Sequence, residues 1–346
     1  MRKAVTVLVA LGVSVSVLGA CLPSVAGEDD CFSTSLHATG EGMRYWYEEE
    51  GGLMNLTGIP YRDLDCSTCH VKSCDQCHAE RNEEAGTCNY STSHAQQTAT
   101  CLTCHSREAL TYRMCEAAGN VDVHGQQCTD CHGAADVHGD GQSYRSMRDA
   151  NAVKTSCLDC HAESTSDIRP HTIHEGKLDC AACHVAATTA CMNCHMDTFL
   201  ETGSRKGTFF PMQDWLLLIN HEGKVTSATA MTIVYQNKRF VCYGPYFSHA
   251  VQPNGRDCAD CHGNEAVKRL QEGKTVPMMT YEGDSPVTWK GVVPVVDGRL
   301  EWVYLNKNGD GWTPLEEDGP ETVQYVEYGT PLTEEQIEMM AMPFRE

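Results

Sequence analysis

The chain is poor in the side chains that build ordinary hydrophobic cores. Leu, Ile, Val and Phe together number 61 of 346 residues, which is under 18%. This low fraction, combined with a net charge of −21, is typical of disordered chains, because too little apolar surface is available to offset the chain entropy lost on folding. If this chain folds, it needs a second source of apolar core.

Basic residues and long apolar runs are also scarce. The 26 Lys and Arg residues face 47 Asp and Glu residues, a balance that argues against binding to nucleic-acid phosphates. Beyond the N-terminal segment, no stretch of the sequence is apolar enough to span a bilayer. We therefore expect no nucleic-acid partner and no integral membrane segment in the mature protein.

The N-terminus has the features of an export leader, which we place at residues 1–27. Arg2 and Lys3 precede an apolar run at residues 5–18 that is short for a transmembrane span. Residues 18–21, Leu-Gly-Ala-Cys, resemble a lipobox that would attach lipid to Cys21, whereas ordinary signal peptidase would cut near residues 25–27. Both schemes predict an exported protein in the periplasm or at the outer-membrane or extracellular surface. A lipid on Cys21 would be its only membrane contact.

Cysteine, in contrast, is abundant, with 21 residues, and most of it belongs to one repeat. The sequence Cys-x-x-Cys-His occurs eight times, far more often than this composition gives by chance. The repeat cysteines are Cys66, Cys69, Cys74, Cys77, Cys101, Cys104, Cys128, Cys131, Cys157, Cys160, Cys180, Cys183, Cys191, Cys194, Cys258 and Cys261. The histidines that follow them are His70, His78, His105, His132, His161, His184, His195 and His262.

This repeat is the attachment motif of c-type haem. Its two thiols bond to the two vinyl groups of one haem, and the adjacent imidazole reaches the iron. A zinc ribbon or a disulfide would not require His after every second Cys, and a thioredoxin-like pair would occur once. We therefore predict eight covalently attached haems, whose apolar macrocycles would supply the missing core.

The other eight histidines match the number of iron positions that remain. Five of them lie within ten residues before a motif, and His37 and His221, far from any motif, are the weakest candidates. Residues 171–174, His-Thr-Ile-His, resemble the paired-ligand signature of class III tetrahaem cytochromes, in which neighbouring histidines serve different haems. As distal ligands we predict His37, His94, His124, His138, His171, His174, His221 and His249.

Four cysteines remain outside the motifs once Cys21 is set aside: Cys31, Cys88, Cys115 and Cys242. An even number in an exported protein suggests two disulfides. Cys88 with Cys115, on either side of the third motif, is the first pairing to consider. Other pairings and free thiols stay open.

The motif spacing divides the chain into two parts. Seven motifs are compressed between Cys66 and His195, so residues 28–200 leave no room for a separate domain around each haem, and the haems must stack. Residues 201–346 carry the eighth motif between apolar, β-branched stretches and end in an acidic tail. The fold class we expect is mostly irregular structure plus short α-helices around a contiguous chain of eight haems, with a small β-rich element in the C-terminal third.

Two hairpins and one calcium loop are suggested within this last part. Residues 236–238 and Asp297-Gly298 are turn signals that would join strands at 230–240 and at 291–305. Residues 306–317 match the spacing of an EF-hand loop, but with Asn306 at the first position, Pro314 inside it and strand-like flanks. A glycine-rich turn after a strand is the simpler interpretation, and calcium is the alternative.

Through the motifs from Cys66 to His262, the chain resembles octahaem and related multihaem c-type cytochromes of anaerobically respiring bacteria. One class of these is made of electron conduits with bis-His irons, including partners of porin–cytochrome complexes and cytochrome filaments. The resemblance and the histidine count favour this class, with one-electron hopping along the haems, other redox proteins as partners, self-association possible in filaments, and no catalytic residue.

The alternative class is enzymatic and acts on nitrogen or sulfur oxyanions, as nitrite, hydroxylamine or tetrathionate oxidoreductases do. These enzymes keep one iron with an exchangeable position, and several replace the motif His by Lys, a variant that is missing from this sequence. An extra histidine that is not a ligand would favour the enzyme.

Overall fold

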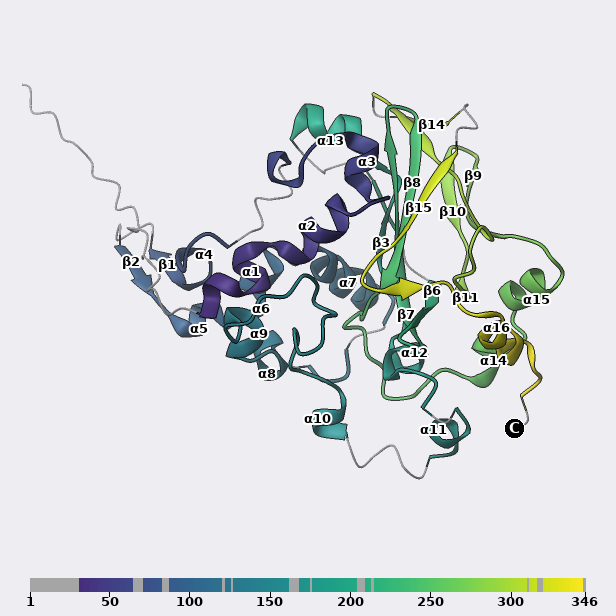
Figure 1. Ribbon diagram of the computed structural model, residues 1–346, viewed down its shortest axis with the longest axis horizontal. Helices are drawn as coiled ribbons and strands as arrows, with labels where there is room; N and C mark the ends of the chain where they lie inside the picture. The colour runs from purple at the N-terminus through teal and green to yellow at the C-terminus, as the bar shows by residue number, and fades with distance from the viewer. Residues whose placement is uncertain are drawn as a thin grey trace, which may run out of the picture.

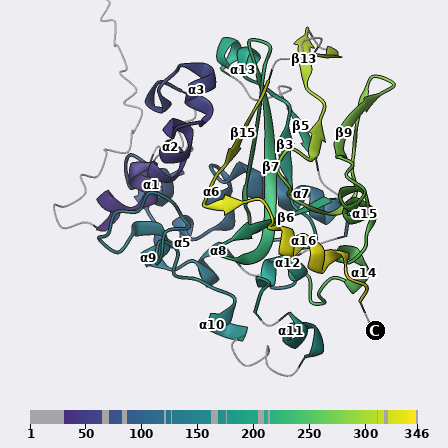
Figure 2. The same cartoon turned by 45° about the vertical axis from the view of Figure 1, so that its right-hand side comes forward.

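The computed structural model describes residues 31–64, 71–82, 87–119, 122–125, 127–161, 168–174, 176–203, 209–212, 215–309, 311–315 and 320–344. Helix makes up 35% and strand 27% of the structure. Short helices and loops gather on one side and a β-rich region on the other (Figure 1), an arrangement that the turned view also shows (Figure 2). Within these described ranges, no helix combines the length and apolarity needed to cross a membrane.

The N-terminal half is built from helices of 3 to 12 residues. They are η1 (Cys31–Thr34), α1 (Leu36–Thr39), α2 (Glu41–Glu48), α3 (Leu53–Thr57), η2 (Tyr61–Asp63), α4 (Asp75–His78), α5 (Thr92–Ala95), α6 (Thr98–Leu102), α7 (Ser106–Ala117), α8 (Cys128–Cys131), α9 (Ala134–His138), α10 (Leu158–His161), α11 (Arg169–Ile173) and α12 (Cys180–His184). A two-stranded hairpin, β1 (Ala79–Asn82) with β2 (Thr87–Tyr90), interrupts them.

The C-terminal half centres on a seven-stranded sheet. Its continuous path runs β11 (Gly291–Pro294), β6 (Trp215–His221), β7 (Lys224–Tyr235), β8 (Lys238–Pro245) and β15 (Glu321–Tyr325). Off this path, β16 (Gly329–Thr330) pairs with β6, and β4 (Cys194–His195) pairs in parallel with β7. The sheet therefore begins before residue 201, the boundary expected from the sequence.

Smaller sheets and helices surround this one. They are the pair β3 (Ala190–Met192) and β5 (Phe210–Met212), the three strands β10 (Ser285–Thr288), β9 (Val276–Glu282) and β12 (Leu300–Trp302), and the hairpin β13 (Leu305–Asn308) and β14 (Gly311–Pro314). The helices are α13 (Met196–Thr202), α14 (Cys258–Cys261), α15 (Glu265–Gln271) and α16 (Glu334–Ala341).

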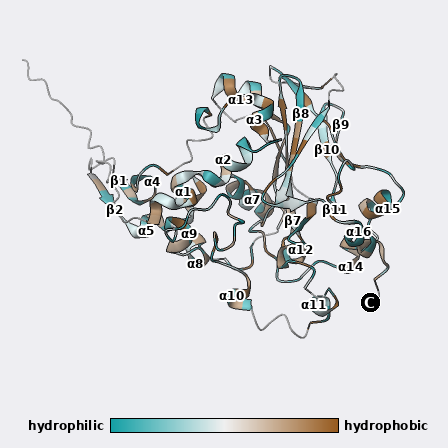
Figure 3. Cartoon of the chain, viewed as in Figure 1, coloured by the Kyte–Doolittle hydropathy of each residue, from teal (hydrophilic) through white to brown (hydrophobic). Residues whose placement is uncertain are grey.

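Period-two alternation in β6 explains why both faces of the sheet are covered. Trp215, Leu217 and Ile219 point into one buried cluster, shared with β9, β12 and β13, while Leu216 and Leu218 point into another, shared with α12, α15 and α16. All five side chains are buried. Figure 3 shows the hydrophobic residues along these strands.

One of the two predicted hairpins forms. Strands β7 and β8 pair in antiparallel register up to Tyr235 and Lys238, and the turn residues Gln236 and Asn237 have φ of 48° and 61°. Two left-handed residues match the right-handed strand twist. This prediction is confirmed.

The second predicted hairpin is wrong. A turn does form at Asp297-Gly298, where the Arg299 N–H donates to the Val296 carbonyl at 3.1 Å. The strands on either side then diverge, because β11 pairs in parallel with β6 and β12 pairs in parallel with β9. Burial of Val292 and Val293 on the main sheet favours this separation over a local hairpin.

The segment from residue 71 to residue 180, which we name the short-helix arm, has almost no protein core. Its described residues include four buried ones, Thr111, Cys115, Ser146 and Ala152. Large apolar side chains such as Leu158, Ile168 and Ile173 are more than half exposed. Exposed apolar side chains of this kind are available to pack against another group.

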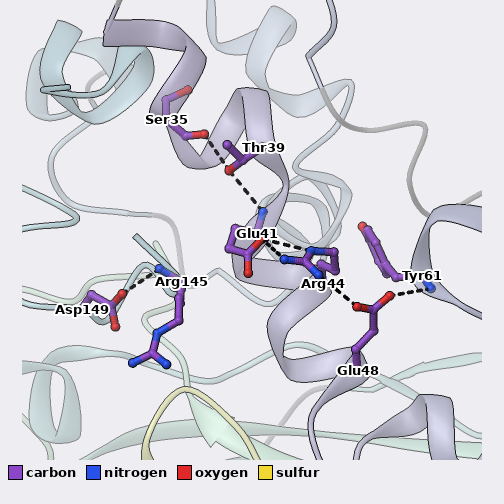
Figure 4. A network of polar contacts seen from close by, with 8 residues as sticks. All are labelled: Ser35, Thr39, Glu41, Arg44, Glu48, Tyr61, Arg145 and Asp149. Atoms are coloured by element: carbon purple, nitrogen blue, oxygen red, sulfur yellow. Dashed lines mark hydrogen bonds and ion pairs between the residues drawn. The ribbon is translucent and has the colours of Figure 1, made fainter. Parts of the chain in front are cut away.

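A polar network stiffens the helices that lead into the arm (Figure 4). Arg44 donates to Glu41 at 2.6 and 3.0 Å and to Glu48 at 3.1 Å, and the other oxygen of Glu48 accepts the Tyr61 N–H at 3.1 Å. The Ser35 side chain caps α1 by accepting the Ala38 N–H at 3.1 Å. The Ser35 cap holds the start of α1, which carries His37, and the other contacts hold α2 and its neighbour η2.

The half-buried carboxyl of Glu327 links the arm to the segment after β15 and predicts a pH effect. Burial raises the pKa of Glu327, which accepts a hydrogen bond from Ser146, so ionised Glu327 destabilises the folded chain at neutral pH. We expect Glu327→Gln to unfold at a higher temperature than the parent at pH 7. The gain should disappear below the ordinary Glu pKa of about 4.3, where both states hold the proton. Melting curves of the two proteins from pH 4 to pH 8 test this, and equal melting temperatures throughout would contradict it.

Candidate haem sites

The motif backbone positions two thiols and an imidazole together. In five motifs the histidine N–H donates to the carbonyl of the first cysteine, four residues earlier, at 2.8–3.0 Å. This single helical turn places residues one, four and five close together. These motifs end in His78, His105, His132, His161 and His262, and the sixth motif forms α12 itself. The first motif, Cys66, Cys69 and His70, lies outside the described residues.

Six of the motif histidines lie against a histidine from elsewhere in the chain. The distances between ring centroids are 6.0 to 6.3 Å, and the angles between ring planes are 65°, 34°, 63°, 64°, 59° and 26°. In the same order, the pairs are His37 with His105, His78 with His138, His124 with His161, His132 with His249, His171 with His184, and His174 with His262.

The spacing of these rings fits one iron between them. Two metal–imidazole bonds of about 2.0–2.1 Å on opposite sides of an iron, plus roughly 1.1 Å from each nitrogen to its ring centre, give about 6.3 Å between centres. The observed separations agree with this value. The plane angle can vary because each ring can rotate about its own metal–nitrogen bond.

The hydrogen bonds of these rings leave the correct nitrogen for iron. In six of these histidines the Nδ1 atom faces an oxygen acceptor at 2.8–3.2 Å, so Nε2 is the atom directed away from the protein contact. The acceptors are Val137 for His37, Asp122 for His124, Asp136 for His132, Pro170 for His174, Gln252 for His184 and Glu108 for His249. His195 differs, because its Nδ1 lies 3.0 Å from the Thr198 hydroxyl and accepts the Thr198 N–H at 3.4 Å.

Electrostatics separate these histidines into two groups. Burial is the main cause that lowers the pKa of His37 and His105, so both imidazoles are neutral at neutral pH, the form that binds metals. Burial also lowers the pKa of His249, but its hydrogen bond to Glu108 and the charge of that carboxylate outweigh it and raise the pKa overall. Glu108 is itself held by Tyr246.

The motif cysteines show how the sites follow one another. The thiols of Cys101 and Cys128 are close enough to affect each other's pKa, as are those of Cys157 and Cys180. Cys77 lies near Cys104, Cys131 near Cys160, and Cys183 near Cys258; burial is the main cause that raises the pKa of Cys77, Cys131 and Cys183, and the neighbouring cysteine raises it further. Because each contact joins one motif to the next along this series, the sites run in the order second, third, fourth, fifth, sixth and eighth.

Several of the predicted distal histidines lie against motif histidines that are distant in the sequence. His37, ranked weakest, lies against His105 because α1 packs beside α9. His171 and His174 lie against histidines of two different motifs, as the resemblance to paired ligands implies. Among the described residues, His94 and His221 lie against no motif histidine.

The seventh motif differs from the others. His195 has no histidine opposite it in the described part of the chain; its ring faces Trp312 of β14, with centroids 6.3 Å apart and planes at 74°. Its backbone is strand rather than helix, since Cys191 lies in β3 and Cys194 in β4. Sequence reasoning missed this difference, because the motif letters are the same.

The cysteines outside the motifs correct one expectation. Cys88 is disulfide-bonded, whereas Cys115 is a buried free thiol, so the Cys88–Cys115 pairing is wrong. Cys115 lies on the buried face of α7, one helical turn after buried Thr111. Cys31 and Cys242 are also free thiols.

The segment that matches the spacing of a calcium loop forms a β-hairpin, as the simpler interpretation predicted. Residues 305–314 form the hairpin β13–β14, in which Lys307 pairs with Trp312, and strands replace the helices that flank an EF-hand. Asp310 and Glu317, two of the expected ligands, lie outside the described residues. Within the described ranges, no group of three or more His, Cys, Asp or Glu is arranged to hold a metal ion directly.

No family model, curated protein or solved structure matches this chain. The geometry of its own residues is therefore the basis for assigning a function.

Proposed function

We propose that this chain is an electron-transfer protein that binds c-type haems covalently at its Cys-x-x-Cys-His motifs and holds most of the irons between two imidazoles. The observation that carries this proposal is the set of six histidine ring pairs at 6.0–6.3 Å. Each pair joins one motif histidine to one histidine outside the motifs.

The nearly coreless arm supports the same proposal. Four buried residues cannot hold the described residues of 71–180 in a fixed arrangement, and the apolar faces of haem would cover side chains such as Leu158 and Ile173. Bound haem would supply the one-electron couple of its iron. The chain's own contribution is to fix each site, to exclude water from it, and to set the reduction potential through the groups that accept a hydrogen bond from histidine Nδ1.

The sites follow one another without a gap from the second to the sixth, and this order favours electron transfer from site to site rather than a reaction at one separate haem. Contacts between thiols of successive motifs bring neighbouring sites together from the second to the sixth and on to the eighth. The paired histidines would also hold each iron from both sides, which would leave no coordination site for a substrate at six irons. Other redox proteins are the partners that such a chain requires, and export to the periplasm or cell surface is part of this proposal.

Electron paramagnetic resonance tests the histidine pairing in detail. Four pairs have ring planes at 59–65° and two at 26–34°. Near-perpendicular imidazoles give strongly anisotropic low-spin ferric signals, and near-parallel ones give rhombic signals. We expect both classes in the oxidised protein, in a ratio of about two to one once the first and seventh sites are assigned. A haem count shows whether all the motifs are loaded.

Two outcomes of this measurement would contradict the proposal. A protein that is exported intact but carries no covalent haem is not a cytochrome. A fully loaded protein in which most irons are high-spin would show that the ring pairs do not bind iron.

An oxidoreductase of nitrogen or sulfur oxyanions is the alternative function. One observation favours it: His195 faces an indole where the other described motif histidines face an imidazole.

A further inference from the structure

Arg256 is a half-buried cation that lies between the sixth and the eighth motifs. Its Nη2 atom donates to the carbonyls of Val185 and Ala186, just after the sixth motif, and its backbone N–H donates to the Cys183 carbonyl at 3.2 Å. These contacts hold the guanidinium beside the sixth motif, while the eighth motif begins two residues later at Cys258. Together with Cys183, Arg256 lines a cavity of about 380 Å³.

The charge of Arg256 acts on both of these sites. Burial raises the pKa of Cys183 and of Cys261, and the charge of Arg256 opposes that effect at both thiols. Burial also lowers the pKa of Arg256, whose Nε atom is buried and has no hydrogen-bond partner in the described part of the chain. A positive charge beside a haem favours the reduced iron, which carries one positive charge less. Arg256 should therefore raise the potentials of the sixth and eighth sites.

The histidine of the eighth motif adds a second effect in the same direction. The Nδ1 atom of His262 is buried and has no hydrogen-bond partner within the described ranges. The Phe344 ring lies beside it, with centroids 6.4 Å apart, and the Gly263 N–H donates to the Met340 carbonyl at 2.9 Å, so the C-terminal segment lies against this motif. An imidazole without an acceptor at Nδ1 gives less electron density to iron, which raises the potential.

The fourth site is a useful comparison, because its motif carries the same carboxylate. Asp130 and Asp260 occupy the same motif position and cap α8 and α14 in the same way. The two sites differ at their imidazoles. Both rings of the fourth site face carboxylates, whereas His262 has no acceptor among the described residues and His174 faces the uncharged Pro170 carbonyl. The potential should therefore be low at the fourth site and high at the eighth.

The eighth site also lies at one end of the described series of sites. Contacts between thiols lead from the second site to the sixth and then from Cys183 to Cys258 of the eighth. In Figure 1, α4 of the second motif and α14 of the eighth lie on opposite sides of the molecule. A high-potential site at the end of the series receives electrons from the sites before it.

We propose that the haem held by Cys258, Cys261 and His262 is the high-potential end of the series, where electrons collect before they leave the protein, and that Arg256 sets this potential. The proposal rests on the proposed function, because it requires haem at the motifs, and it adds a direction, from the fourth site through the fifth and sixth to the eighth. In each step one ferrous site is oxidised and the next, ferric site is reduced. An oxidised redox protein takes the electron from the eighth site.

The test is a potentiometric titration of the haem-loaded protein followed by electron paramagnetic resonance. Ring planes at 26° give the eighth site a rhombic signal, and planes at 59° give the sixth a strongly anisotropic one. We expect the signal of the eighth site to be the first to disappear on reduction. His174→Met changes the distal ligand of this site alone, so the rhombic signal that it removes identifies the site independently of Arg256.

Arg256→Gln removes the charge and should lower the potentials of the sixth and eighth sites together. A unit charge about 10 Å away, at an effective dielectric constant of about 20, changes the redox equilibrium on the order of tenfold, which is about 59 mV for one electron. Arg256→Lys keeps the charge and should keep both potentials near those of the parent. Arg299→Gln is the matched control, because Arg299 also donates through Nη2 to two backbone carbonyls, those of Leu270 and Lys274, and it should move neither potential.

The possible outcomes separate this inference from the proposed function. If the signal lost in His174→Met is not the first to be reduced in the parent, the direction of transfer is wrong. If Arg256→Gln shifts neither site, or if Arg256→Lys lowers the potentials equally, the charge of Arg256 does not set them. Both results leave haem attachment and histidine pairing intact. A chain without covalent haem, or with high-spin iron at most sites, would refute the proposed function itself.

Discussion

Without haem attachment, the short-helix arm should lose its structure while the sheet keeps its own. The arm's described residues include only four buried ones, whereas strands β6, β7 and β8 lie in large buried clusters. Expression of the chain where no haem is attached should therefore leave amide exchange in residues 71–180 almost unprotected. Strand amides should remain slower by roughly a thousandfold or more, which corresponds to a local stability of about 4 kcal/mol. Hydrogen exchange read by mass spectrometry measures both regions in one experiment.

The haem-loaded protein is the control for this experiment. Its arm should gain protection, and the gain should be largest beside the histidine pairs. Equal protection of the arm with and without haem would show that the polypeptide alone holds it, and the role of haem as its core would be refuted.

Replacing His249 should produce the largest change of potential at a single site. His249 faces His132, and both rings donate from Nδ1 to a carboxylate, Glu108 and Asp136 respectively. Two such partners make both imidazoles electron-rich, which stabilises ferric iron, so the fourth site should have a low potential. We expect His249→Met to raise its potential by on the order of 0.1 V, part of the roughly 0.8 V range that axial ligands span. Potentiometric titration followed optically measures this shift.

A graded variant separates the ligand from its support. Glu108→Gln keeps His249 but weakens the acceptor, so it should raise the same potential by a smaller amount, on the order of 50 mV if the loss is about 1 kcal/mol. Asp122→Asn, which removes the carboxylate partner of His124, is the matched control and should move the fifth site instead. If neither Glu108→Gln nor His249→Met shifts any potential, the pairing of His249 with His132 around one iron is wrong.

The local arrangement of the helical motifs and part of the β region could be predicted from the sequence alone. The two cysteines and the histidine of Cys-x-x-Cys-His lie within one helical turn in these motifs, so their closeness follows from their spacing. The β7–β8 turn was predictable in the same way, since Gln236 and Asn237 lie next to the strands that they join. Features that depend only on residues close together in the sequence can be predicted without a structure.

Contacts between distant segments could not be read in this way. His249 precedes the eighth motif by nine residues, yet its ring lies against His132 of the fourth, because β8 and the following loop carry it back to α7. His124 likewise precedes the fourth motif but faces His161 of the fifth. The divergence of β11 and β12 into different sheets is a similar case, since burial of Val292 and Val293 on β6 outweighs the local turn signal.

The seventh motif shows a further limit of sequence patterns. Its letters match the other motifs, but Asn193 is left-handed, with φ of 55°, and ties the motif to Leu305, more than a hundred residues later. Only the fold reveals that an indole, and not an imidazole, faces His195.

The thiol contacts between neighbouring motifs also bear on how the protein is made. Cys101 with Cys128 and Cys157 with Cys180 are close enough to affect each other's pKa, and the two thiols of each pair belong to different motifs. In an oxidising compartment such neighbours can form disulfides across motifs, and each wrong bond would remove a thiol from two haem sites at once. If haem is attached as proposed, maturation of this chain would have to keep its cysteines reduced until the haem bonds are made, so the folding that brings the thiols together would have to follow attachment or keep pace with it.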